Sequence, residues 1–251
     1  SGASAWRWGV RAPWRCRAIE SAGDRASVAV GSSSDGRAET SVSVARRHAA
    51  ALVPLMQAAL RESESTLDDI EGVLISDGPG SFTGLRVGAS VAKALAHARR
   101  LPLWSASTLL VSAAGVPYEE GQPVFVVSEA LRGEVYAASY RLWQGRVETL
   151  RAPAVSRPDD LGREYEAAEV LAVCGYEGLA NRLPSFSGQV VGAPGALPRA
   201  ATLIGLLGRS GAMIRQMDPG NWEPEYGRPA EAQARWEAEH GRRLPDSSRA
   251  T

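Results

Sequence analysis

A turn rich in glycine separates a predicted buried strand from a predicted helix, and its special residues are Gly78, Pro79, Gly80 and Gly84. Such a turn can bring backbone N–H groups close to a phosphate at the N-terminus of the helix. Two carboxylates could hold the magnesium ion of a bound nucleotide there, Asp77 before the loop and Glu20 in an earlier turn. The chemistry open to these residue types is therefore phosphate binding or phosphoryl transfer.

The spacing of the loop departs from both common nucleotide-binding motifs. The Walker pattern requires Lys followed by Ser or Thr after the last glycine, whereas Leu85 and Arg86 follow here. The dinucleotide fingerprint GxGxxG has two residues between its second and third glycines, whereas three residues separate Gly80 from Gly84 here. Packing is the favoured alternative, because small residues recur at every fourth position and would let another helix approach closely: Gly84, Gly88, Ala92 and Ala96.

Histidine and cysteine patterns predict no metal site. His48 is followed four residues later by Leu52, so the pair of imidazoles that would share one helical face is missing from the sequence. We expect His48 at the edge of a core or an interface. Cys16 and Cys174 belong to no CxxC pair, which argues against a cysteine-based zinc site. The sequence therefore predicts neither a metal nor a cofactor.

The elements that position the loop follow from hydrophobic periodicity. In the first half we expect a strand, turn and strand over 18–30, a helix over about 42–62, a buried strand over 72–76, a helix over 84–99, a strand over 101–107 and a short helix over 108–115. A strand, a glycine-rich turn, a helix and a second strand in this order predict a right-handed crossover between parallel strands.

The second half shows a similar alternation. We expect two strands within 123–147 and a third element after Gly145, then a loop over 151–165 and a strand over 169–175 followed by a helix start. A loop over 184–200, a helix over 201–217 and an exposed helix over 231–243 complete the expected elements. Strands that alternate with helices in both halves predict an α/β chain. We divide it into an N-terminal extension (1–17), two lobes (18–110 and 111–217) and a partly helical tail (218–251).

Charge and hydropathy exclude some classes of function. Lys and Arg number 28 and so do Asp and Glu, which gives a formal net charge of zero. A protein that binds nucleic acid unaided usually has a basic surplus, so that class is disfavoured. No apolar run reaches the roughly 18 residues that a membrane-spanning helix needs. Isolated cysteines fit a reducing compartment, and we expect a cytoplasmic protein with no membrane contact.

The segment GPGSFTGLRVGASVAKALAHARRLPLWSASTL resembles the signature of the TsaB (YeaZ) family, whose loop reads GPGSFTGxRxG. The matching loop positions are Gly78, Pro79, Gly80, Ser81, Phe82, Thr83, Gly84 and Arg86. Four other stretches are similar to family motifs: AIESAGDRASVAV, RRHAAALVPLMQAAL, VVSEALRGEVYAASY and EPEYGRPAEAQARWE. The resemblance covers roughly residues 16–240.

The resemblance implies a two-lobed fold of the actin/Hsp70/sugar-kinase (ASKHA) superfamily, each lobe being a mixed sheet flanked by helices. It also implies that the chain is a pseudoenzyme, a non-catalytic scaffold for TsaD. TsaD is the transferase that makes N6-threonylcarbamoyladenosine (t6A) in tRNA. The ATPase TsaE joins the larger complex, and the chain contacts tRNA only through that complex. Family members can also pair with themselves, so a homodimer is a further expectation. We expect the two helices around the loop to dock on TsaD through His48, Leu52, Met56, Leu85, Gly88, Ala92 and Leu95.

Two other functions stay open at this point. The family and its superfamily usually carry an Asp-Thr pair in the opening turn, where this chain has Glu20 and Ser21. The longer side chain would shift the geometry of a metal and phosphate, yet an ATP-dependent phosphotransferase or hydrolase of the same superfold is the main alternative. Direct tRNA contact could use three arginine pairs, although each is more typical of a solvated helix end: 46–47, 99–100 and 242–243.

Overall fold

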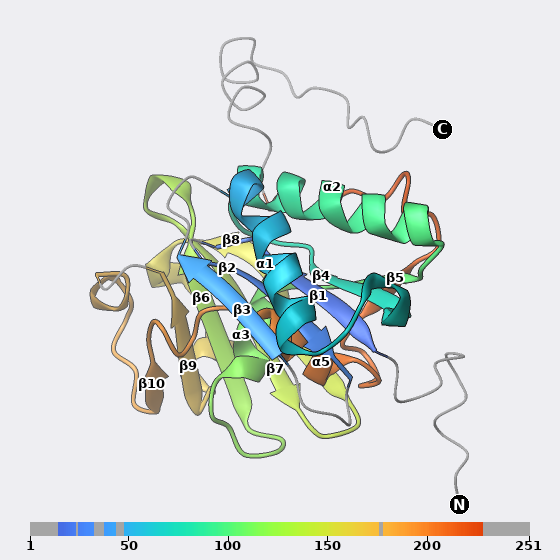
Figure 1. The fold of residues 1–251 in the computed structure, drawn as a ribbon. Coiled ribbons are helices and arrows are strands. Elements are labelled where there is room, and N and C mark those ends of the chain that lie inside the picture. Colours follow the sequence, from blue (N-terminus) through green and yellow to red (C-terminus); the bar gives the residue numbers. More distant parts are fainter. Residues whose placement is uncertain (1–14, 24, 33–37, 44–47, 176–177, 228–251) are drawn as a thin grey trace, which may run out of the picture.

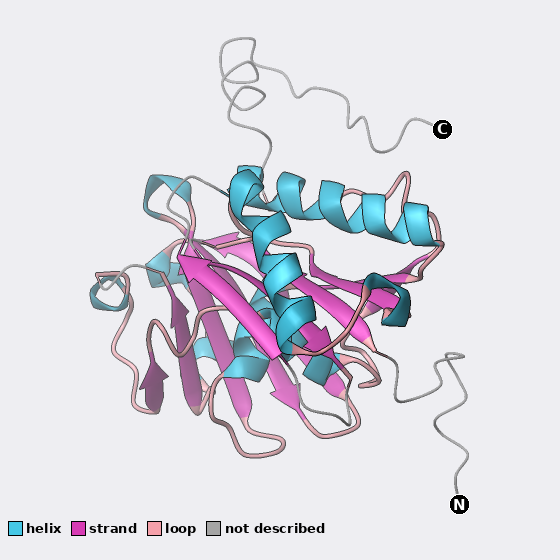
Figure 2. Ribbon diagram, in the orientation of Figure 1, coloured by secondary structure: helices cyan, strands magenta, loops and turns pink. Residues whose placement is uncertain are grey.

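The computed structural model describes residues 15–23, 25–32, 38–43, 48–175 and 178–227. They form two mixed β-sheets with helices between and outside them (Figures 1 and 2). The predicted fold class, an α/β chain with two mixed sheets flanked by helices, is confirmed. The predicted helix over 231–243 and almost all of the N-terminal extension lie outside the described residues. In the described part, no helix is both long and apolar enough to span a membrane.

The first sheet has the strand order β11-β5-β4-β1-β2-β3. Its strands are β1 (Cys16–Glu20), β2 (Arg25–Gly31), β3 (Ala38–Ser43), β4 (Gly72–Ser76), β5 (Leu103–Ala106) and β11 (Ile214–Gln216). The strands β1, β4 and β5 run parallel, whereas β2, β3 and β11 are antiparallel to their neighbours. The parallel strands are buried along their whole length because both faces of this sheet are covered by helices.

The second sheet repeats this topology, with the strand order β10-β9-β6-β7-β8. Its strands are β6 (Pro123–Glu129), β7 (Val135–Leu142), β8 (Val147–Ser156), β9 (Val170–Cys174) and β10 (Gln189–Val191). As in the first sheet, three antiparallel strands come first in the chain and two parallel strands follow. The fold is therefore internally duplicated, although the sequence shows no repeat.

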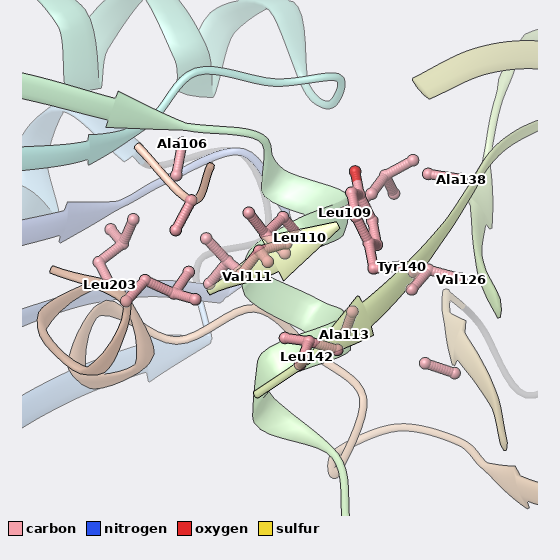
Figure 3. Packing of buried hydrophobic residues seen from close by; sticks show 14 of the residues in the cluster. Ala106, Leu109, Leu110, Val111, Ala113, Val126, Ala138, Tyr140, Leu142 and Leu203 are labelled. Atoms are coloured by element: carbon pink, nitrogen blue, oxygen red, sulfur yellow. The ribbon is translucent and has the colours of Figure 1, made fainter. Parts of the chain in front are cut away.

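The helices divide into layers. The helices α1 (His48–Glu62) and α2 (Phe82–Arg99) cover the outer face of the first sheet. The helices α3 (Thr108–Gly115) and α5 (Ala200–Leu206) lie between the sheets, and α4 (Arg163–Glu166) packs on the outer face of the second. Figure 3 shows residues of α3, among them Leu109 and Ala113, packed against Val126, Ala138 and Leu142 of the second sheet. One hydrophobic core thus joins both sheets.

Most elements lie close to their predicted positions: the two strands of the opening segment, and β4, β5, α3, β6, β7 and β9. Several other boundaries were predicted wrongly. Residues 42–43 belong to β3, and the first helix is described from His48. The predicted loop over 151–165 begins as strand, because β8 continues to Ser156. Pro153 is tolerated there because β8 is an edge strand and its pairing with β7 is irregular at that point.

The last predicted helix was also too long. It ends at Leu206, and the glycines Gly208 and Gly211 adopt positive φ angles that suit a turn before β11. The predicted loop over 184–200 contains the short strand β10, and the described residues after 177 form only a 3-10 turn (Ala180–Arg182) where a helix start was expected. Residues 200–216 pack on the first sheet again, through α5 and β11. The division of the chain into two lobes at residue 110 stays a prediction.

Candidate functional site

The glycine loop connects the end of β4 to the start of α2. The helix begins at Phe82, two residues earlier than predicted, because Ser81 caps it: the Ser81 Oγ accepts a hydrogen bond from the Gly84 N–H at 3.3 Å. The Ser81 N–H in turn donates to the carbonyl of Ala22, at 2.6 Å. The loop is therefore fixed both to its own helix and to the opening turn between β1 and β2.

The opening turn packs directly on the glycines of the loop and helix. A Cβ atom on Gly80 would lie 2.4 Å from the Ala22 carbonyl oxygen, and one on Gly88 would lie 2.2 Å from the Ser21 Oγ. Ser21 also donates a hydrogen bond from its Oγ to the Gly84 carbonyl, at 2.9 Å. The small-residue face of α2 therefore allows close packing, as the sequence predicts. Gly88 packs on this turn and on the sheet beneath it, and Ala92 and Ala96 share a hydrophobic cluster with residues of α1.

A second segment, residues 223–227, crosses the loop from the other side. The Glu225 N–H donates to the Asp77 carbonyl at 2.7 Å, and the rings of Phe82 and Tyr226 are 4.7 Å apart. Gly78 has a φ of +109° and a Cβ there would lie 2.0 Å from the Glu225 carbonyl oxygen. Two stretches that carry the family resemblance, about 145 residues apart, thus meet in one structural unit.

Three N–H groups of the loop and the first turn of α2 are used within the chain. The N–H of Gly78 donates to the Thr108 Oγ1 at 3.1 Å, and those of Ser81 and Gly84 are used as described above. Backbone of the opening turn lies where a ligand would have to approach Gly80. The loop is accordingly a packed joint between three segments of the chain.

The two candidate magnesium ligands have different surroundings. Glu20 is 0% exposed, and its Oε1 accepts a hydrogen bond from the Ala22 N–H at 2.7 Å. Burial raises the pKa of Glu20 to about 7, and the nearby Asp77 adds to this shift. Burial also raises the pKa of Asp77 to about 6, with a further rise from Glu225 and an opposing effect of the Ser105 hydroxyl. Burial thus favours the neutral form of Glu20, which disfavours it as a cation ligand.

A cavity of about 430 Å³ opens beside the loop, between the ends of β4 and β5 and the strands β7 and β8. Asp77, Gly78 and Pro79 line it, whereas Glu20 does not. Ser105, Ser107 and Tyr140 contribute hydroxyl groups. The hydroxyls could not be located from sequence, because they come from β5, from the start of α3 and from β7 of the other sheet.

The residues predicted to dock on a partner lie mostly in the core. Leu52, Leu85, Gly88 and Ala92 are buried, while Met56 and Leu95 are half-buried and pack on the same cluster. His48 begins α1, and its side chain lies outside the described part. Buried residues cannot contact a partner directly, so we correct their role: they hold the two helices in place, and any docking surface must be formed by other side chains.

The outer face of the two helices carries exposed apolar residues that the sequence reasoning did not assign to docking. Val53 on α1 is 52% exposed and Phe82 on α2 is 40% exposed. The guanidinium carbon of Arg86 lies 5.3 Å from the centre of the Phe82 ring. Helical spacing would not have predicted the exposure of Phe82, because Phe82 lies three residues before the buried Leu85 and therefore on a similar side of the helix.

The other candidate sites receive no support from geometry. Arg99 forms an ion pair with Asp68, and Arg100 ends α2 in a left-handed conformation, while the remaining two arginine pairs lie outside the described residues. Across the described ranges, no group of three or more His, Cys, Asp or Glu side chains could hold a metal ion.

Comparison with known families identifies relatives of this chain. The family model described as TsaD, tRNA N6-adenosine threonylcarbamoyltransferase, matches residues 42–197. The protein from Escherichia coli (strain K12) named tRNA threonylcarbamoyladenosine biosynthesis protein TsaB is 34% identical over 152 residues, which cover 58% of this chain and 63% of that protein. The chain therefore matches less than two thirds of the length of this relative.

Two further proteins align over more of the chain. The protein of the same name from Bacillus subtilis (strain 168) is 26% identical over 200 residues, which cover 76% of this chain and 84% of that protein. Among solved structures, "YeaZ from Pseudomonas aeruginosa" superposes with a TM-score of 0.69 at 27% identity, covering 78% of this chain and 91% of the other. Both sheets thus have counterparts in a solved relative.

Proposed function

Because this chain belongs to the TsaB (YeaZ) family, we propose that it acts in the synthesis of t6A in tRNA, as a non-catalytic subunit that docks on TsaD. TsaE joins the same complex in this proposal, and tRNA is held by the partners. A formal net charge of zero supports this division of labour, since a subunit that bound tRNA unaided would need a basic surface.

The observation that carries the proposal is the outer face of the α1–α2 layer. These helices contact each other and cover one face of the first sheet, and their buried residues fix them firmly to it. Val53 of α1 and Phe82 at the start of α2 remain exposed. A rigid pair of helices with apolar side chains facing outward is suited to helix-to-helix contact with another chain.

The alternative, an ATP-dependent phosphotransferase or hydrolase, gains no support from the site. The glycine loop is packed against the opening turn, and the raised pKa of Glu20 disfavours it as a magnesium ligand. Reconstitution separates the two functions. TsaD, TsaE, tRNA, ATP and threonylcarbamoyl-adenylate should yield t6A only when this chain is added, and the chain alone should yield none. Unchanged t6A when the chain is omitted, or ATP turnover by the chain alone, would contradict the proposal.

Docking predicts a specific effect of charge at Val53. Val53→Asp places an unpaired carboxylate in an apolar contact, and we expect it to weaken binding of TsaD at least about tenfold, which corresponds to roughly 1.4 kcal/mol. Val190→Asp is the matched control, because Val190 on β10 is 50% exposed and Val53 is 52% exposed. Titration calorimetry with purified TsaD measures both variants. Equal affinities of Val53→Asp and the unmodified chain would refute docking through this face.

A further inference from the structure

The cavity between the two sheets has the size and walls of a small-molecule site. Its volume of about 430 Å³ lies within the usual range for ligand pockets. One wall carries Asp77 together with the hydroxyls of Ser105 and Ser107, and the facing wall carries Tyr136 and Tyr140 of β7. Convergent polar groups on largely apolar walls are typical of sites that select one kind of ligand.

One of these polar groups is deeply buried and only weakly bonded. Tyr140 is 2% exposed, and its hydroxyl donates to the Ser107 Oγ at 3.4 Å, which is long for a hydrogen bond between hydroxyls. Burial raises the pKa of Tyr140 to about 12, so the phenol stays neutral at physiological pH. A neutral phenol held in this way can still donate to or accept from a ligand in the cavity.

The charged residues that line the cavity are all acidic. Asp77 and Glu225 both line it, and the described lining residues include no Arg, Lys or His. Burial raises the pKa of Asp77 to about 6, and the nearby carboxylate of Glu225 adds to this rise. The phosphates of a nucleotide would meet like charges there, whereas a cation would be attracted by both carboxylates and would contact the tyrosine side chains that line the cavity.

We propose that this cavity binds a small organic cation through its ammonium group, with Asp77 as the counter-ion and the rings of Tyr136 and Tyr140 as the apolar walls. The site would not accept a nucleotide. This proposal is independent of docking to TsaD, because the cavity is formed by the single chain and lies on the other side of the first sheet from the outer face of α1 and α2.

The test compares ligands that differ only in charge. Choline and its neutral analogue 3,3-dimethylbutan-1-ol have nearly the same shape, and n-butylamine supplies a primary ammonium group. We expect calorimetry on the full chain at pH 7.5 to show at least tenfold tighter binding of choline or n-butylamine than of the neutral alcohol. A preference for n-butylamine would indicate direct hydrogen bonding to Asp77, and a preference for choline would indicate a larger part for the tyrosine rings.

Variants and competitors complete the test. Asp77→Asn should weaken binding of the cation at least tenfold, and Glu225→Gln should weaken it less, because Glu225 is exposed and its substitution leaves the fold intact. Affinity should also fall as Asp77 is protonated below about pH 6. Equal binding of the neutral alcohol, no binding of either cation at 10 mM, or displacement of the cation by Mg-ATP would each overturn the proposal.

Discussion

Gly80→Ala should lower the free energy of unfolding by about 3 kcal/mol or more, one of the largest effects expected of any single methyl group in this chain. The new Cβ would lie 2.4 Å from the carbonyl oxygen of Ala22 and 2.8 Å from the Ala22 Cβ. Neither atom belongs to a flexible side chain, so the opening turn would have to move as a unit. That movement would break the hydrogen bond from Ser81 to Ala22.

Urea denaturation measures this effect, and Gly145→Ala is the matched control. Gly145 also lies in a turn, but a Cβ there would meet nothing within 4 Å, and its φ is not positive. We expect Gly145→Ala to change stability by less than about 0.5 kcal/mol. If Gly80→Ala unfolded at the same urea concentration as the unmodified chain, the packed joint described above would be wrong.

The glycine loop shows what the sequence could and could not predict. The spacing of small residues on α2 was sufficient to predict a close approach, because only Gly or Ala permits one. It could not identify the partner, because Ser21 and Ala22 lie about 60 residues earlier in the chain and nothing local links them to the loop. The contact with Glu225 is more distant still. The cavity was missed for the same reason, since its two walls come from different sheets.

The boundaries of the helices and strands were likewise predicted in part. The strand over 72–76 was predicted at its observed bounds, because an uninterrupted apolar run between polar residues has few alternatives. Helix ends were missed where one residue decides them: Ser81 starts α2 through its side chain, and Gly208 follows the early end of α5. The second half of β8, from residue 151, was assigned to a loop because the segment is rich in proline and charge, and Pro153 is tolerated only because β8 lies at the sheet edge.

The buried carboxylate of Glu20 should make the protein less stable as pH rises from about 4.5 to about 7. Burial raises its pKa from 4.5 to about 7 in the folded chain. Between these values the unfolded chain has lost the proton and the folded chain keeps it, so ionisation favours unfolding. The stabilisation is complete below pH 4.5 and is lost as the pH passes 7. The shift of about 2.5 pKa units corresponds to roughly 3 kcal/mol.

Glu20→Gln should remove this contribution, because an amide does not ionise. The Gln side chain can still accept the hydrogen bond from the Ala22 N–H, and the hydroxyl of Ser76, which lies beside Glu20, offers an acceptor for the new N–H groups. Relative to the unmodified chain, the variant should therefore gain stability progressively between pH 4.5 and 7.5 in urea denaturation. Glu148→Gln, at an exposed position on β8, should leave the pH dependence unchanged. If the Glu20→Gln and unmodified chains kept a constant difference in stability across this range, Glu20 would have to be ionised in the folded protein, and a cation near the opening turn would then have to be considered.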